Sequence, residues 1–365
     1  MKIIQLDLKN TRGEHFYYIK DDNLIQKEKD LESLIDEEKH LNKRSFAKKV
    51  LLSHELQANN EIEGIRDDLS VIRTAINNIE SIKNEAIRKR IINLYNAYNF
   101  ILDEPQINET TLKQLYLIIS KDLLEREDQD KMGEFYRRED VYILKNGRLD
   151  ASHDKGIEPS KIEEWMDMYF NFLNSFNVDS RIDEYIKSQI MHYFFVYIHP
   201  FIDVNGRTSR TLSIWYLLNK EIYPYIIFNR GIALNKTGYD RKISLTSKTK
   251  NLSMFLNMML DAVYTEVQKE YVMNIITESI SYDLDSIDYQ NLLFYLSIRS
   301  EKNLKNFKDF YNRQTGQSLK YKEIKQKLSP LIDKGILYLT GKEHNPSILL
   351  NDFEIDKTKT KSLRF

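Results

Sequence analysis

Apolar residues recur at three- and four-residue steps along much of this chain, a pattern typical of helices that bury one face. The clearest stretches cover residues 86–102 and 109–124, and a weaker one covers 45–60. Two further stretches, 182–198 and 207–218, are apolar on nearly every side. Helices of that kind lie in the interior of a domain. The pattern therefore predicts a mainly α protein with these two helices at its centre.

One short strand signal stands out among these helices. A run of β-branched and aromatic residues leads into Asn146-Gly147. Asn-Gly favours two-residue hairpin turns, because both turn positions take positive φ. We therefore expect a hairpin over residues 140–151. A helix should begin soon afterwards at Ser160, whose side chain can form a capping box with Glu163.

The pattern changes after about residue 285. Three short amphipathic stretches precede two strand-like stretches at 335–341 and 347–350. Three helices followed by a hairpin predict a winged-helix domain over residues 280–365. Residues 301–365 hold 14 Lys and Arg against 8 Asp and Glu, an excess that could serve DNA. The lysines are mixed with acidic residues and the third helix carries no Arg, so the pattern favours protein binding, with DNA binding as the open alternative.

Composition narrows the class of protein. A chain of 365 residues that is 41% hydrophobic suits two or three globular domains, and only 11 Gly and 6 Pro favour helices. The absence of cysteine excludes disulfides and thiolate metal sites and agrees with a cytoplasmic location. No apolar run reaches 18 residues and no signal-peptide core is present, so we expect no membrane association. The net charge of −1 gives no overall attraction to nucleic acid. The first forty residues show no clear pattern.

The most polar loop of this region, HPFIDVNGR, lies between the two central helices. His199 can take a proton near neutral pH, and Asp203 is a hard oxygen ligand suited to Mg²⁺. The helix that follows offers free N–H groups at its start, an anion site. Arg207 and Arg210 are three residues apart and project from the same side of its first turn. A base, a metal carboxylate and an anion cradle predict phosphoryl or nucleotidyl transfer.

The stretch from His199 to Arg210 resembles the signature of the Fic family, HPFx[D/E]GNGRxxR. Eight of the nine fixed positions match, and the exception is Val204 in place of glycine. The resemblance extends loosely from about residue 45 to 265. It implies a helical-bundle core at 86–270 with a β-hairpin flap, preceded by an N-terminal region at 1–85.

The resemblance also implies a role for each matching residue. His199 would deprotonate the target hydroxyl, and Asp203 would hold Mg²⁺ at the α- and β-phosphates of ATP. Arg207 would bind the β-phosphate and Arg210 the γ-phosphate. The α-phosphate would lie in the cradle formed by the turn of Val204, Asn205 and Gly206.

The hairpin expected at 140–151 resembles the family's flap, which holds the target segment by strand addition. An ordinary surface hairpin is the alternative. The tract Gly133-Glu134-Phe135-Tyr136-Arg137 resembles the family's approach to this flap.

An inhibitory helix is also implied, at about residues 45–64. Many family members carry [S/T]xxxE[G/N] on a helix whose glutamate pairs with the second arginine of the motif. Here Glu63-Gly64 matches that pattern and Asn59 takes the place of Ser or Thr. The Glu63 carboxylate would compete with the γ-phosphate for Arg210. The alternative is a solvated glutamate at a helix end.

The sequence therefore predicts a protein adenylyltransferase that moves AMP from ATP to a Tyr, Thr or Ser hydroxyl of a target protein or of itself. Inhibited members of the family often form dimers, so a homodimer is compatible with this assignment. Removal of AMP by the same fold is an alternative activity. A nucleotide-sensing, DNA-binding regulator is an alternative of a different class, and an intact His199 argues against it.

Overall fold

The computed structural model describes most of the chain, in two compact units. One unit holds residues 1–40, 48–67 and 72–268, and the other is built mainly from residues 269–365. The described residues are 1–39, 46–65, 67, 71–72, 84–124, 126–133, 135–141, 156–175, 178, 180–222, 228–280, 303–333 and 337–350. Within these ranges no helix is both long and apolar enough to cross a membrane.

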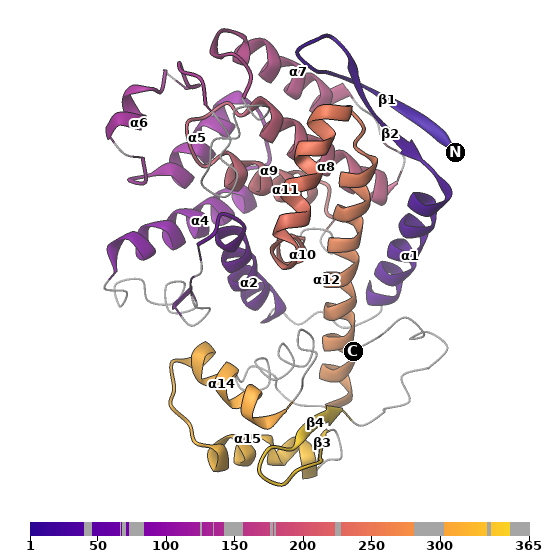
Figure 1. The fold of residues 1–365 in the computed structure, drawn as a ribbon, viewed down its shortest axis with the longest axis vertical. Coiled ribbons are helices and arrows are strands. Elements are labelled where there is room, and N and C mark those ends of the chain that lie inside the picture. Colours follow the sequence, from indigo (N-terminus) through magenta and orange to yellow (C-terminus); the bar gives the residue numbers. More distant parts are fainter. Residues whose placement is uncertain are drawn as a thin grey trace. The chain divides into compact units, whose positions relative to one another are not determined.

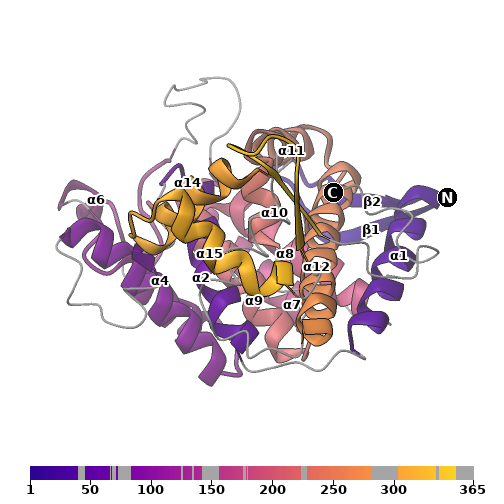
Figure 2. The same cartoon turned by 90° about the horizontal axis from the view of Figure 1, so that it is seen from below.

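The fold is mainly helical, as the sequence predicted, and two buried helices form the centre of the larger unit. Helix α8 (Arg181–Ile198) packs against α9 (Asn205–Asn219), and both are buried along most of their length. Helices α4 (Glu85–Asp103) and α5 (Glu109–Ser120) pack against each other and against α9. Figures 1 and 2 show α4 on one side of the central pair and α12 (Ser253–Ile280) on the other.

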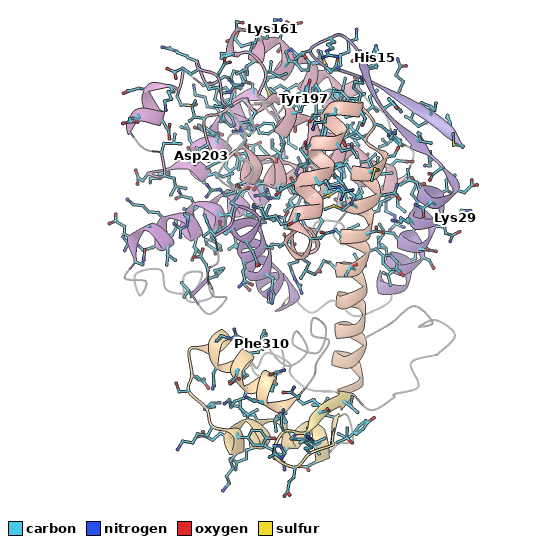
Figure 3. All side chains as sticks on the ribbon, viewed as in Figure 1. His15, Lys29, Lys161, Tyr197, Asp203 and Phe310 are labelled. Carbon is cyan, nitrogen blue, oxygen red and sulfur yellow. The ribbon has the colours of Figure 1, made fainter. Side chains whose placement is uncertain are left out.

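Other short and long helices complete this unit. They are α2 (Phe46–Ile62), α6 (Arg126–Asp130), the 3-10 helix η2 (Pro159–Lys161), α7 (Ile162–Ser175), α10 (Asn229–Leu234) and α11 (Lys236–Thr249). Side chains fill the space around the central helices, and Asp203 lies on the side that carries α4 and α5 (Figure 3).

Several helix starts follow local sequence signals, and one departs from the signal that the sequence contains. Asn84 caps α4 through the Ile87 N–H at 3.1 Å, and Asn108 forms a capping box at the start of α5. The box predicted for Ser160 and Glu163 is not formed. Helical geometry already begins at Pro159, which is well suited to a first helical position, so Ser160 lies inside a 3-10 turn.

The first forty residues form a hairpin and a helix that the sequence pattern did not indicate. Strand β1 (Lys2–Lys9) pairs antiparallel with β2 (His15–Lys20), and α1 (Asp22–Lys39) follows. Alternate side chains of the strands are buried, as in a sheet with one covered face. Among them, Phe16 packs edge-on against Tyr193 of α8 with ring centroids 5.6 Å apart. The hairpin thus covers one side of the central helix.

The second unit contains two of the three helices expected in the C-terminal part. Helix α14 (Leu304–Thr315) is followed by α15 (Tyr321–Asp333) and by the antiparallel pair β3 (Leu337–Thr340) and β4 (Ser347–Leu350). The first expected helix falls in residues 281–302, outside the described part of the chain. The winged-helix assignment and the predicted domain boundaries therefore stay predictions.

Candidate active site

The loop between α8 and α9 begins at His199, which caps α8 in the left-handed conformation at φ 53°. The His199 N–H still donates to the carbonyl of Phe195 at 3.0 Å. Pro200 follows, and proline disfavours helical geometry in the residue before it. A left-handed non-glycine residue costs free energy and persists only where its surroundings hold it in place.

Arg137 holds this part of the backbone in place. Its Nε donates to the His199 carbonyl at 2.7 Å, and its own N–H donates to the Pro200 carbonyl at 3.0 Å. Its remaining nitrogens donate to the carbonyls of Glu139 and Ile157. The side chain is buried at 2% exposure, and burial lowers the pKa of its guanidinium. Arg137 belongs to the tract at residues 133–137 that resembles the family's approach to the flap, but nothing in the sequence indicated that Arg137 would hold the His199 backbone.

The His199 ring is neutral and has one nitrogen that can accept a proton. Its Nδ1 lies 3.2 Å from the carbonyl of Val196, which fixes Nδ1 as the donor and leaves Nε2 as the acceptor. Burial lowers the pKa of His199 to about 4, and the nearby Arg137 charge acts in the same direction. The imidazole is therefore neutral at pH 7, which is the form that a general base requires.

Helix α9 begins without a side-chain hydrogen bond to its first N–H groups. Val204 is the N-cap residue in the left-handed region at φ 59°, and no side chain caps the helix. Asn205 instead bonds across the loop, accepting from the Phe201 N–H at 3.0 Å and donating to its carbonyl at 2.8 Å. A helix start with free N–H groups attracts anions.

Arg207 and Asp203 stand beside this helix start. Arg207 is 7% exposed, its Nη2 lies 4.0 Å from Asp203 Oδ2, and burial lowers its pKa. Its Nε has no hydrogen-bond partner among the described residues, which is costly for a buried donor. Both residues line a cavity of about 520 Å³ that Lys89 and Arg90 also line. An unsatisfied guanidinium and an exposed carboxylate fit a phosphate with a bound Mg²⁺.

Arg210 lies deeper, at 1% exposure, and α2 occupies its hydrogen bonds. Its Nε donates to Asn59 Oδ1 at 2.8 Å, and its Nη2 donates to the Asn59 carbonyl at 3.2 Å and to Glu63 Oε1 at 2.6 Å. Burial alone would raise the pKa of Glu63, but the Arg210 charge and hydrogen bond hold it below its usual value. The residues that the sequence analysis assigned to an inhibitory contact thus meet, although they are 147 positions apart.

The ends of this contact depend on two glycines. Gly64 has φ 82° and ends the helical turn, which lets the Glu63 side chain face α9. Gly206 sits where a Cβ would collide with the Glu63 carboxylate and lie 3.1 Å from Arg210 Nη1. Glycine at 206 therefore allows Glu63 to reach the arginine.

A buried carboxyl, Glu55, lies on α2 eight residues before the partly exposed Glu63. Glu55 is 4% exposed, and burial raises its pKa to about 8. Its charged neighbours are Arg230, Glu266 and Arg210, and neither carboxylate oxygen has a hydrogen-bond partner among the described residues. Arg230 and Glu266 form an ion pair with Nε and Oε2 3.1 Å apart. Sequence reasoning did not identify this group.

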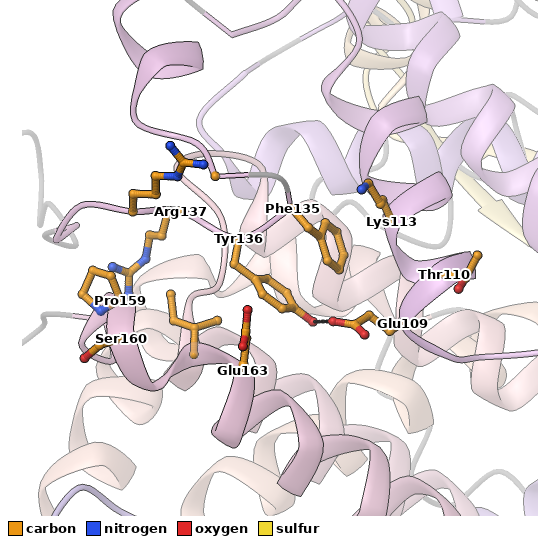
Figure 4. Close-up of a pocket in the computed structure, with 12 residues that line it drawn as sticks. Glu109, Thr110, Lys113, Phe135, Tyr136, Arg137, Pro159, Ser160 and Glu163 are labelled. Carbon is orange, nitrogen blue, oxygen red and sulfur yellow. Dashed lines mark hydrogen bonds between the residues drawn. The ribbon is translucent and has the colours of Figure 1, made fainter.

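A larger cavity adjoins Arg137. It measures about 810 Å³ and is lined by residues 135–138, Pro159, Ser160, Ile162 and Glu163, among others (Figure 4). Within it the Tyr136 hydroxyl donates to Glu109 at 2.9 Å. The hairpin expected at 140–151 falls largely outside the described residues. Its flanking residues are close, because the Gly156 N–H donates to the Val141 carbonyl at 3.2 Å.

Comparison with known proteins agrees with the motif. Residues 106–217 match the model of the Fic/DOC family. The chain is 33% identical over 130 residues to protein adenylyltransferase Fic of Drosophila mojavensis, a match covering 33% of this chain and 23% of that protein. The corresponding protein of Culex quinquefasciatus is 34% identical over 129 residues, covering 33% and 24%. The chain thus spans about a quarter of the length of these relatives.

Solved structures match over a longer stretch. A Fic family protein from Desulfovibrio desulfuricans G20 has a TM-score of 0.60 at 16% identity, covering 92% of this chain and 98% of that one. Fic-1 from C. elegans has a TM-score of 0.53 at 18% identity, covering 70% and 74%. At this identity the likeness shows the fold.

Proposed function

The chain carries a Fic domain at residues 106–217, and from this premise we propose that it is a protein adenylyltransferase held in check by Glu63. Its substrates would be ATP and a Ser, Thr or Tyr hydroxyl of a target protein or of the chain itself. The observation that supports the proposal is a neutral His199 at the end of α8 and, eight residues on, a buried Arg207 with an unpartnered Nε at the uncapped start of α9. A base and an anion cradle a few residues apart suit transfer of a phosphate-linked group.

The reaction assigns a task to each of these groups. His199 Nε2 takes the proton from the target hydroxyl, whose oxygen then forms a bond to the α-phosphorus of ATP. The bond between that phosphorus and the oxygen bridging to the β-phosphate breaks, and pyrophosphate leaves. The free N–H groups of α9 and the Arg207 guanidinium stabilise the negative charge on the phosphates. A Mg²⁺ ion held by Asp203 would neutralise further phosphate charge.

The proposed inhibition by Glu63 follows from the contacts of Arg210. Arg210 Nε and Nη2 already donate to Asn59 and Glu63, so this edge of the guanidinium is not free for a γ-phosphate. ATP can then bind through Arg207 and the helix start alone, in a pose that does not align the α-phosphate for in-line attack. Withdrawal of the Glu63 end of α2 would free Arg210 and complete the site.

The experiment that tests the proposal is label transfer from α-³²P-ATP with Mg²⁺. Wild type, Glu63→Gly and Glu63→Gly/His199→Ala are compared, with the chain itself and added cell protein as acceptors. We expect protein-bound label to rise at least tenfold in Glu63→Gly and to disappear in the double variant. A γ-labelled ATP control should leave protein unlabelled. Label that survives loss of His199 would contradict its role as base, and label from γ-³²P-ATP would indicate a kinase instead.

A further inference from the structure

Arg90 of α4 is a second arginine on the wall of the cavity that Asp203 and Arg207 line, and it lies outside the sequence motif. Helix α4 packs against α9, which brings Arg90 and Arg207 to one cavity of about 520 Å³ although they are far apart in the sequence. Lys89 lines the same cavity, but it pairs with Glu85 on its own helix at 2.9 Å. A cavity of this volume falls in the range of ligand-binding pockets.

The Arg90 guanidinium is held loosely by the residues that the structure describes. Its Nε is covered from solvent and has no hydrogen-bond partner among them. Its Nη2 lies 3.7 Å from Asp67 Oδ1, which is longer than a hydrogen bond. The Asp67 carboxylate also accepts from Asn60 Nδ2 at 3.3 Å, so it keeps a partner if Arg90 turns away. Arg90 can therefore donate to an incoming anion without leaving a buried carboxylate unpaired.

The charged groups around this cavity differ in their exposure to water. The carboxylates of Asp122 and Asp203 belong to exposed residues. The Arg207 side chain is 8% exposed and the Arg90 side chain is 23% exposed. Water screens the exposed carboxylates well and the two guanidiniums less, so the cavity favours an anion in spite of its equal numbers of acidic and basic residues. The carboxylates suit an anion that arrives with Mg²⁺.

We propose that Arg90 binds the β-phosphate of ATP together with Arg207, and that it holds the pyrophosphate group as this group leaves. The inference rests on the proposed function, in which Arg207 binds the phosphates of ATP. Two guanidiniums on one cavity wall can donate to different oxygens of a single diphosphate. Negative charge grows on the leaving pyrophosphate as its bond to the α-phosphorus breaks, and Arg90 stabilises that charge. Arg210 is not among the described residues that line this cavity, so its role at the γ-phosphate is separate.

The test is isothermal titration calorimetry in the Glu63→Gly background, which needs no protein target. Mg·ADP, Mg·pyrophosphate and AMP are each titrated into Arg90→Gln and into its parent. We expect the affinities for Mg·ADP and Mg·pyrophosphate to fall about tenfold, because a hydrogen bond between charged groups is lost. The affinity for AMP, which has no β-phosphate, should stay within about twofold. Arg88→Gln is the matched control, because it makes the same chemical change on α4 at a residue that does not line the cavity.

Arg207→Gln in the same background separates this inference from the function on which it rests. If Arg207→Gln binds Mg·ADP and Mg·pyrophosphate as its parent does, the phosphate assignment of the proposed function is wrong, and the inference fails with it. If Arg207→Gln weakens both but Arg90→Gln weakens neither, only the role of Arg90 is refuted. An equal loss of ADP and AMP affinity in Arg90→Gln, with a lower unfolding temperature, would also refute that role. Such a result would mean that Arg90 only supports the fold through its ion pair with Asp67.

Discussion

Replacing Glu63 with glutamine tests the inhibition by Glu63 most directly, because the change keeps the size of the side chain and removes its charge. The ion pair that it breaks joins Arg210, at 1% side-chain exposure, to Glu63, at 36%, with Nη2 and Oε1 2.6 Å apart. A hydrogen bond between charged groups contributes about 1.5–3 kcal/mol, and partial exposure of Glu63 favours the lower end. About 1.5 kcal/mol corresponds to about a tenfold change in an equilibrium.

The apparent Kd for Mg·ATP should therefore fall about tenfold in Glu63→Gln, because a larger fraction of the protein has Arg210 free. The Kd for Mg·ADP should change less than about twofold, since ADP has no γ-phosphate. Glu63→Gly also clears the space beside Gly206 and should increase label transfer further. Calorimetric titration with both nucleotides measures the first effect, and transfer from α-³²P-ATP measures the second.

Two further observations make the test specific. Without nucleotide, Glu63→Gln should unfold at a lower temperature than wild type, because a buried arginine loses a partner. Saturating Mg·ATP should then raise the unfolding temperature more in the variant than in wild type. Glu61→Gln is the matched control, because it makes the same chemical change two residues away, within α2, whereas Glu63 follows the last helical residue, Ile62. An unchanged ratio of ATP to ADP affinity in Glu63→Gln would refute competition between Glu63 and the γ-phosphate.

Two predictions concern groups that the sequence did not assign. Arg137→Met removes the side-chain donor that holds the His199 carbonyl. In the Glu63→Gly background, kcat for label transfer should therefore fall at least about tenfold, with little change in the KM for ATP. Arg138→Met, at an exposed neighbouring position, is the control and should leave kcat close to that of its parent, so equal effects of the two substitutions would contradict the positioning role. Glu55→Gln tests the buried carboxyl, whose raised pKa of about 8 means that folding takes up a proton between the usual value of 4.5 and about 8. Because of Glu55, the free energy of unfolding falls as pH rises through that window. Urea unfolding at pH 5.5 and pH 8 should therefore show a larger free energy of unfolding for Glu55→Gln than for wild type, and the difference should be greater at pH 8. An equal difference at both pH values would contradict the raised pKa of Glu55.

The central helices and the loop between them could be predicted because both depend on signals local in sequence. A helix apolar on nearly every side has to lie inside, and α8 and α9 do. Pro200 predicted the break after His199, and the spacing of Arg207 and Arg210 placed both on one side of α9. The contact between Glu63 and Arg210 spans 147 positions and was predicted only through the resemblance to a family pattern.

Contacts that depend on tertiary packing were not predictable in this way. The Tyr239 hydroxyl and His192 Nε2 lie 2.6 Å apart although the residues are separated by 47 positions, and each alone has the pattern of an ordinary core residue. Glu55 lies on a helix with only a weak apolar face, so its position gave no sign that the carboxyl would be buried. The β1–β2 hairpin was missed because one covered face needs few apolar residues, here Leu6 and Leu8 on one strand and Phe16 and Tyr18 on the other.

The contacts of Arg210 explain how one helix can control this site without rebuilding it. Asn59 and Glu63 lie four residues apart at the end of α2, so both reach the same arginine. Asn59 is fully buried and neutral, whereas Glu63 is partly exposed and charged. Glu63 can therefore exchange its partner for water at modest cost, while Asn59 cannot. A phosphate that displaces Glu63 then meets an arginine still held by Asn59. The free-energy difference between the inhibited and open states is then set mainly by one partly exposed ion pair. That difference is small enough for the binding of a partner to reverse it.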